Sequence, residues 1–131
     1  MCIRDSLSPE APVPVVSAKR ESTTLGGAAN VAQNLISLGA KVTLAGLVGA
    51  DSYGDQLIDI LKQEGIDTCA IVKDKARPTT VKTRILAGNH QLVRVDYEVT
   101  TPVSADLQQQ LVDVLDKCIL CLLYTSPSPR D

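Results

Sequence analysis

An alternation of helical and extended patterns constrains the fold of this chain more than any other feature of its sequence. Residues 26–38 predict a helix that stops at Gly39, because large aliphatic side chains recur on one face at three-to-four spacing. That face consists of Val31, Leu35 and Leu38. The next stretch, residues 41–48, is a continuous apolar run, KVTLAGLV, as is typical of a strand buried on both faces. A helix that leads into such a strand indicates a sheet covered by helices.

Residues 51–64 predict a second helix, which Asp51 or Ser52 caps and Gly65 ends. Its apolar face consists of Leu57, Ile58 and Leu61. A short strand is predicted after it, over residues 68–72. We interpret Asp51 as a helix cap rather than a ligand, because capping is the usual role of an aspartate at this position.

An extended stretch at residues 12–18, PVPVVSA, comes before the first helix, and Pro14 confines it to a sheet edge or a strand start. The predicted order is therefore strand, helix, strand, helix, strand. Crossovers of this kind join parallel strands, and helices then cover the sheet. We predict the α/β class, with a three-layer, Rossmann-like parallel sheet.

The pattern changes to a period of two after Pro78. Residues 79–86 and 91–97 alternate between apolar and polar side chains and are separated by Ala-Gly-Asn-His, which predicts a β-hairpin. A hairpin has no place inside a parallel sheet, so we expect it to stand off as a flap. Ser104 then begins a third helix, and residues 118–120 resemble the start of a further strand. The predicted inward face of that helix is Leu107, Leu111, Val114 and Leu115.

Composition argues against several classes of protein. The formal net charge is -2 at pH 7, so there is no basic stripe for nucleic acid. No apolar run is long enough to span a membrane. Away from the two ends the cysteines are Cys69 and Cys118, whose spacing suggests neither a metal site nor a disulfide framework. We expect a soluble cytoplasmic protein with reduced thiols and with no nucleic-acid or membrane partner.

The two ends of the chain share an unusual relationship at the level of DNA. The oligonucleotide ATGTGTATAAGAGACAG encodes residues 1–5, and its reverse complement, read in another frame, encodes residues 121–125. This is the pattern of a library adapter left on both ends of a sequencing read. We therefore expect residues 1–6 and 121–131 to be adapter-derived scars, and residues 7–120 to be the part that folds.

The strongest candidate for chemistry is the stretch LGGAANVA at residues 25–32. Gly26 and Gly27 open a helix without a Cβ to keep a ligand away from the backbone amides, and Asn30 follows one turn later. The alternative is a glycine turn with an asparagine on the polar side of a helix. The stretch lacks the third glycine of a dinucleotide fingerprint and the Gly-Lys-Ser/Thr of a P-loop.

Residues 26–57 as a whole resemble the N-terminal signature region of PfkB (ribokinase-type) carbohydrate kinases, including a Gly-x-Asp-x-x-Gly stretch at residues 49–54. Within that family, LSPEAPVPVV at residues 7–16 is similar to heptose 7-phosphate kinases. The predicted hairpin, residues 78–98, resembles their lid and contains Gln-Leu-x-Arg-x-Asp at residues 91–96.

This resemblance implies a ribokinase-like fold with a hairpin lid, truncated here to its N-terminal part. It implies transfer of phosphate from ATP, with Mg²⁺, to the anomeric hydroxyl of heptose 7-phosphate on the way to ADP-heptose and the lipopolysaccharide core. The substrate-binding residues that it implies are Gly26, Gly27, Asn30 and, on the lid, Arg94. Lys82 and Arg84 are weaker candidates for holding the phosphate of the substrate. The resemblance also allows a homodimer formed through the lid.

Other features of the family have no match here. Its Gly-Ala-Gly-Asp motif, with the catalytic aspartate, occurs nowhere in this chain, so we assign no catalytic residue and no metal ligand and expect the fragment to be inactive. Two alternatives remain open, a ribokinase- or fructokinase-like sugar kinase and a non-catalytic sugar-binding module. Whether a nucleotidyltransferase domain follows is also open.

Overall fold

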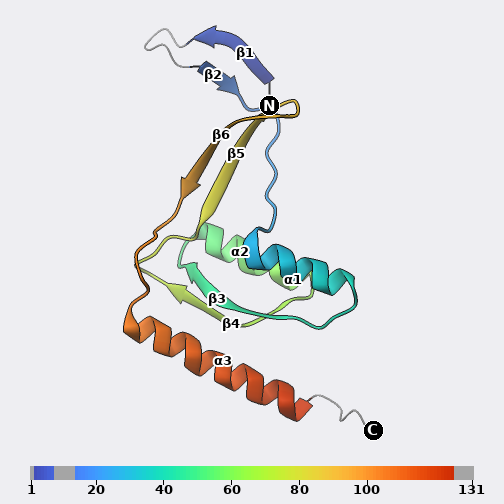
Figure 1. The fold of residues 1–131 in the computed structure, drawn as a ribbon, viewed down its shortest axis with the longest axis vertical. Helices are drawn as coiled ribbons and strands as arrows, with labels where there is room; N and C mark the ends of the chain where they lie inside the picture. Colours follow the sequence, from blue (N-terminus) through green and yellow to red (C-terminus); the bar gives the residue numbers. More distant parts are fainter. Residues whose placement is uncertain (1, 8–13, 126–131) are drawn as a thin grey trace. The chain divides into compact units, whose positions relative to one another are not determined.

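The computed structural model describes residues 2–7 and 14–125 of the chain (Figure 1). The chain forms two compact units. One comprises Met1–Thr24 and Val81–Tyr97, and the other comprises Leu25–Thr80 and Glu98–Asp131. All of the described helices lie in the second unit.

The second unit is built on two parallel strands, β3 (Thr43–Gly49) and β4 (Asp67–Asp74). Figure 1 shows α1 (Gly27–Ser37) and α2 (Ser52–Gln63) on one face of this pair and α3 (Ala105–Thr125) on the other. The predicted α/β class, the parallel pairing and the three layers are therefore confirmed.

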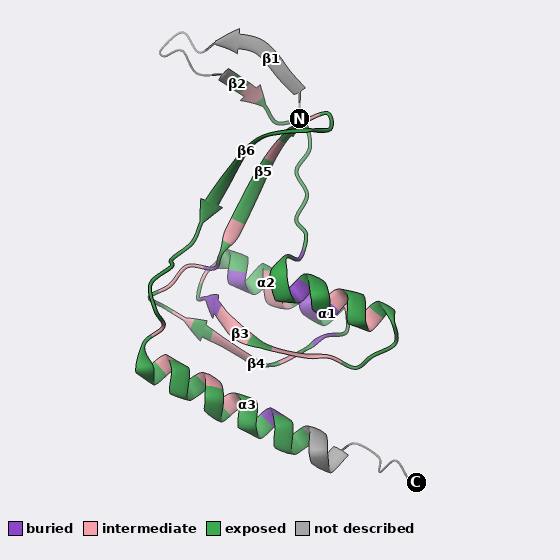
Figure 2. Ribbon diagram, in the orientation of Figure 1, coloured by how far each residue is buried: buried purple, intermediate pink, exposed green. Residues whose placement is uncertain are grey.

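The core lies between the first two helices and the strands. Leu61 of α2 and Ala70 of β4 are completely buried, and Ile66 is nearly so (Figure 2). The prediction for α2 is confirmed, since Asp51 caps it and Leu61 lies on its buried face. Gly65 follows the helix with a φ of 80°, a left-handed conformation that glycine adopts without strain.

The apolar face that the spacing predicts for α1 is not the face that the structure buries. Its buried residues are Ala29 and Ala32, whereas the larger side chains on its other side are exposed. Those exposed side chains are Val31, Leu35 and Leu38. Both sides of the helix carry apolar side chains, and the two alanines lie in the core cluster with Ile36 packed against it.

The third helix begins as predicted but continues further. Leu107, Leu111 and Val114 are half-buried, and Cys118 is buried one turn beyond them. Leu115, which was expected to point inward, is exposed. The strand predicted at residues 118–120 is wrong, because the apolar stripe of the helix continues through Cys118.

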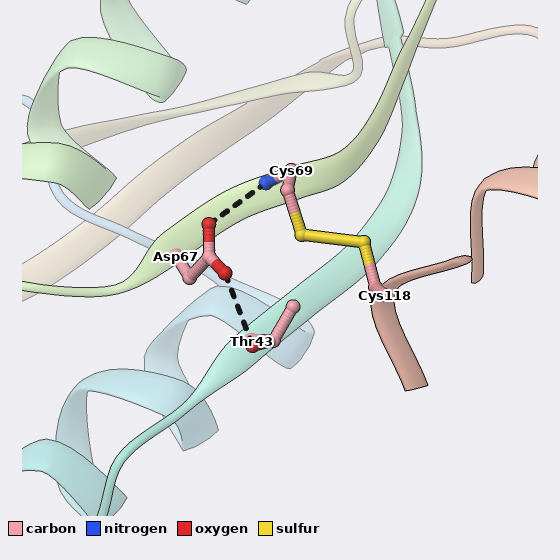
Figure 3. The surroundings of a disulfide bond; sticks show 4 residues. All are labelled: Thr43, Asp67, Cys69 and Cys118. Carbon is pink, nitrogen blue, oxygen red and sulfur yellow. Dashed lines mark hydrogen bonds between the residues drawn. A yellow bond between two sulfur atoms is a disulfide. The ribbon is translucent and has the colours of Figure 1, made fainter. Parts of the chain in front are cut away.

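A disulfide joins Cys69 of β4 to Cys118 of α3 (Figure 3). The expectation of unpaired thiols is therefore corrected. A strand at residues 118–120 would have belonged to the sheet, whereas the helix places Cys118 over β4. Beside the disulfide, the Asp67 carboxylate accepts hydrogen bonds from the backbone amide of Cys69 (3.1 Å) and from the hydroxyl of Thr43 (3.4 Å).

The first unit contains two antiparallel pairs. The hairpin prediction is confirmed by β5 (Val81–Ala87) and β6 (His90–Tyr97), with Gly88 in the turn at a φ of 58°. The other pair joins β1 (Cys2–Leu7) to β2 (Pro14–Ser17). The prediction that the strand before α1 belongs to the parallel sheet is therefore wrong.

Two of the observed elements include residues that were expected to be adapter-derived. Strand β1 lies almost wholly within residues 1–6, and the last turns of α3 reach Thr125. Regular structure in these segments does not test their origin in DNA, which stays a prediction. None of the helices in the described part of the chain is long and apolar enough to cross a membrane.

Candidate functional site

The first helix opens at Gly26 without help from a side chain. Gly26 is the N-cap in an extended conformation, and no side-chain hydrogen bond caps the helix. Its carbonyl oxygen accepts hydrogen bonds from the amides of Ala29 (3.2 Å) and Asn30 (3.4 Å). The first amides of a helix have no acceptor within the helix and carry a partial positive charge. This end of α1 can therefore bind an oxygen atom of a ligand.

The backbone conformation at position 27 favours glycine. Its φ is 54°, which L side chains rarely adopt, and a Cβ built on it would meet nothing within 4 Å. The same open space surrounds Gly26. The two glycines therefore leave the start of the helix accessible, as the predicted sugar site requires.

Asn30 lies one turn into the helix and is exposed, next to the buried Ala29. Within the described residues, its side-chain amide makes no hydrogen bond. An amide group that both donates and accepts is suited to a sugar hydroxyl. An exposed position also fits an asparagine that only meets solvent.

The Gly-x-Asp-x-x-Gly stretch at residues 49–54 forms a hydrogen-bond network with Thr79. The Oδ1 atom of Asp51 accepts hydrogen bonds from the amide of Gly54 (2.8 Å) and from the hydroxyl of Thr79 (2.7 Å), and Oδ2 accepts one from the amide of Thr79 (2.9 Å). The Thr79 hydroxyl in turn accepts a hydrogen bond from the amide of Gly49 (2.9 Å). The hydrogen bonds from the Thr79 amide, the Thr79 hydroxyl and the Gly54 amide, in that order, lower the pKa of Asp51 below its ordinary value of 3.8.

Both glycines of this stretch are required by close packing. A Cβ on Gly49 would lie 2.5 Å from the amide nitrogen of Thr79 and 2.6 Å from Oδ2 of Asp51. A Cβ on Gly54 would collide with the carbonyl oxygen of Gly49 and would lie 3.0 Å from the hydroxyl oxygen of Thr79. The interpretation of Asp51 as a cap is confirmed, because its carboxylate is occupied by protein donors.

Thr79 is the residue of this network that no sequence motif indicated. It is the buried polar residue of the described chain, 7% exposed, and lies between the end of β3 and the start of α2. The stretch at residues 49–54 supported only the family resemblance and the cap at Asp51. Nothing in the sequence indicated which other segment would contact it.

The hairpin carries a charged face and an apolar face. Lys82 lies opposite Asp96 and Arg84 lies opposite Arg94, so the four side chains share one face. Oδ1 of Asp96 lies 2.9 Å from Nε of Arg94, and Oδ2 lies 3.8 Å from Nζ of Lys82. Lys82 and Arg94 therefore share one carboxylate, and Arg84 adds a third positive charge to the same face. The other face pairs Val81 with Tyr97, Thr83 with Val95 and Ile85 with Val93.

The predicted site residues fall into two groups. Gly26, Gly27 and Asn30 lie together at the start of α1, in the second unit. Arg94 lies on the charged face of the hairpin, in the first unit. Residues 8–13, which carry much of the resemblance to heptose 7-phosphate kinases, lie outside the described residues. Among the described residues, no cluster of three or more His, Cys, Asp or Glu side chains could hold a metal ion.

Comparison with known proteins assigns the chain to a family. The family model described as pfkB family carbohydrate kinase matches residues 1–123. The chain is 59% identical over 109 residues to the Bifunctional protein HldE of Helicobacter pylori (strain Shi470), a match that covers 83% of this chain and 24% of that protein. It is 45% identical over 115 residues to the Bifunctional protein HldE of Trichlorobacter lovleyi, covering 88% of this chain and 23% of that protein.

Among solved structures, an uncharacterized sugar kinase from Pyrococcus horikoshii is similar with a TM-score of 0.49 and 40% identity, covering 55% of this chain and 24% of that one. The chain thus spans about a quarter of the length of the curated relatives that it matches. Because the family model covers nearly all of the sequence, this chain belongs to the pfkB family of carbohydrate kinases.

Proposed function

We propose that this chain is the N-terminal part of a kinase that transfers phosphate from ATP to the anomeric hydroxyl of heptose 7-phosphate, a step toward ADP-heptose and the lipopolysaccharide core. The observation that carries this proposal is the open start of α1 at Gly26 and Gly27, in a member of a carbohydrate kinase family. The similarity to Bifunctional protein HldE directs the proposal toward a heptose substrate.

In this proposal the sugar binds at the start of α1. Backbone amides near Gly26 and Gly27 donate to a sugar oxygen, where the absence of a Cβ permits close approach. Asn30 adds a side-chain amide one turn further along.

The phosphate that the substrate already carries would bind to the charged face of the hairpin. Arg94 is the main candidate, because its guanidinium group can bind a phosphate through two parallel hydrogen bonds. Asp96 lies 2.9 Å from Nε of Arg94 and would hold the guanidinium in place. Lys82 and Arg84 add positive charge to the same face.

The described residues do not fit ATP and Mg²⁺. They contain no cluster of carboxylates for the metal ion, and the whole sequence lacks the Gly-Ala-Gly-Asp motif with the family's catalytic aspartate. We therefore place ATP, Mg²⁺ and the catalytic aspartate in parts of the protein beyond this chain, and expect the chain alone to transfer no phosphate. We further propose that the whole protein is cytoplasmic, binds neither nucleic acid nor membranes, and dimerises through the apolar face of its hairpin.

The experiment is a substrate panel on the full-length protein. ATP-dependent phosphorylation of heptose 7-phosphate, ribose and fructose would be followed by release of ADP. We expect heptose 7-phosphate to be used with a kcat/KM at least about a hundredfold above the unphosphorylated sugars, because a site built for a charged group rejects ligands that lack it. Preference for ribose or fructose would favour the alternative sugar kinases, and binding without turnover would favour a sugar-binding module.

A further inference from the structure

We propose that Asp51 and Thr79 form a positioning pair that anchors the segment leading into the β5–β6 hairpin to the turn between β3 and α2, and that the enzyme needs this anchor to use its sugar substrate. This inference rests on the proposed function, in which the hairpin supplies a substrate contact. It assigns a role to two residues that do not themselves touch the sugar.

The pair holds the segment that leads into the hairpin. Thr79 lies two residues before β5 begins at Val81, and both its backbone amide and its hydroxyl donate to the Asp51 carboxylate. Its hydroxyl also accepts from the amide of Gly49. Because Thr79 is buried and three hydrogen bonds hold it, the segment that leads into the hairpin is fixed on the β3–α2 turn at Thr79.

A second contact ties the segment that leaves the hairpin to the same place. The guanidinium group of Arg77 donates to the carbonyl oxygens of Val99 (3.2 Å) and Thr101 (2.6 Å), which follow the end of β6. Arg77 is two residues from Thr79, so both connections of the hairpin converge on one short stretch of chain. Movement of residues 77–79 would therefore shift both of the segments that connect to the hairpin.

The contribution of the pair can be distinguished from that of the helix cap, because one substitution disrupts the pair and leaves the cap in place. Thr79→Val keeps the shape of the side chain but removes the hydroxyl, which strands the amide of Gly49. The hydrogen bond from Gly54 to Asp51, which caps α2, is left in place. Thr79→Ser keeps the hydroxyl and should behave as the native residue does. Ile66→Val, a substitution in the core away from the pair, is the control for general loss of stability.

The test uses the full-length protein with the sugar and ATP varied in turn, together with hydrogen exchange of residues 77–82 and 97–101. We expect Thr79→Val to lower kcat/KM for the sugar about tenfold, as when a buried hydrogen-bond partner is lost, and to leave the KM for ATP unchanged. Amide exchange should rise in both segments. Thr79→Ser should restore the native values, and Ile66→Val should lower the melting temperature without changing the KM for the sugar.

Unchanged sugar kinetics in Thr79→Val would overturn the inference, as would an equal effect on both substrates. The substrate panel on the unmodified protein tests the proposed function independently. If that panel identifies a sugar other than heptose 7-phosphate, the Thr79 variants are measured with that sugar. If the protein turns over no sugar, the proposed role of the pair in substrate use is wrong. Increased amide exchange in Thr79→Val would then identify the pair as a purely structural contact.

Discussion

Two turns in this chain each bring a pair of glycines to the start of a helix, and they do so for opposite reasons. At Gly26 and Gly27 the space around the backbone is empty, and no side chain caps α1. At Gly49 and Gly54 the space is filled by Asp51 and Thr79, and Asp51 caps α2. Glycine keeps an approach open in the first turn and permits contact between protein segments in the second. A glycine motif alone therefore does not identify a ligand site.

The largest effect expected from this comparison is on folding stability. Gly54→Ala should lower the free energy of unfolding of the full-length protein by about 3 kcal/mol, because the new Cβ collides with the carbonyl oxygen of Gly49. Gly26→Ala should change it by no more than about 0.5 kcal/mol, since its extended backbone suits any residue and no atom lies nearby. Urea denaturation measures both variants. Similar losses of stability would show that the two turns do not differ as described.

A second substitution should affect both stability and the sugar. Gly27→Val forces a branched side chain into a left-handed conformation, at a cost of about 1–2 kcal/mol, and places it where the sugar is proposed to bind. We expect kcat/KM for the sugar to fall more than about tenfold, with the KM for ATP unchanged.

Gly39→Val provides the matched control for this substitution. Gly39 also has a positive φ, 89°, and a Cβ there also meets nothing within 4 Å, but it lies after the end of α1. The Gly39→Val variant should lose a similar amount of stability and keep its kcat/KM for the sugar. If both variants lose sugar activity equally, backbone strain rather than a blocked site explains the effect.

The stability that the turn at residues 49–54 contributes should also depend on pH. The folded pKa of Asp51 lies below its ordinary value of 3.8, so its ionised form stabilises the fold above pH 3.8. That contribution should be lost as the pH falls from 3.8 through the lower, folded pKa. Asp51→Asn should reduce the dependence of stability on pH in this acidic window. Thermal melting of both proteins between pH 2 and pH 6, at intervals of about one pH unit, would measure this dependence. Parallel curves for the two proteins would mean that the Thr79 and Gly54 hydrogen bonds do not depend on the charge.

The smallest expected effect is at the turn that contains Gly26 and Gly27. Asn30→Ala should lower kcat/KM for the sugar by about threefold to tenfold, the value of one ligand hydrogen bond. Asn34→Ala, at another exposed asparagine of α1, should leave the sugar kinetics unchanged. If Asn30→Ala also leaves them unchanged, Asn30 lies on a solvated helix face and only the glycines remain as candidates.

The sequence predicted secondary structure better than it predicted burial. For α2 the apolar residues occupy one face, and Leu61 lies at the centre of the core as expected. For α1 apolar residues occupy two faces, and periodicity cannot choose between them. The three-to-four spacing pointed to the face of Val31 and Leu35, whereas the structure packs Ala29 and Ala32 inward.

Long-range contacts account for the other errors. The carboxylate of Asp51 was correctly expected to cap α2, because a cap is a local interaction. Its second partner, Thr79, is 28 residues away and cannot be found from spacing. The pairing of Cys69 with Cys118 was missed for the same reason, since it depends on whether residues 118–120 continue a helix or begin a strand.

The disulfide between Cys69 and Cys118 gives the chain a covalent topology as well as a fold. The two cysteines are 49 positions apart, and β5 and β6 both lie between them. While the bond is intact, this part of the chain is a closed ring of which the hairpin is one arc. A protease that cuts the turn at Gly88 would open the ring but release nothing. Under denaturing conditions the cut protein would remain one molecule in the absence of a reductant and separate into two fragments when a reductant is added.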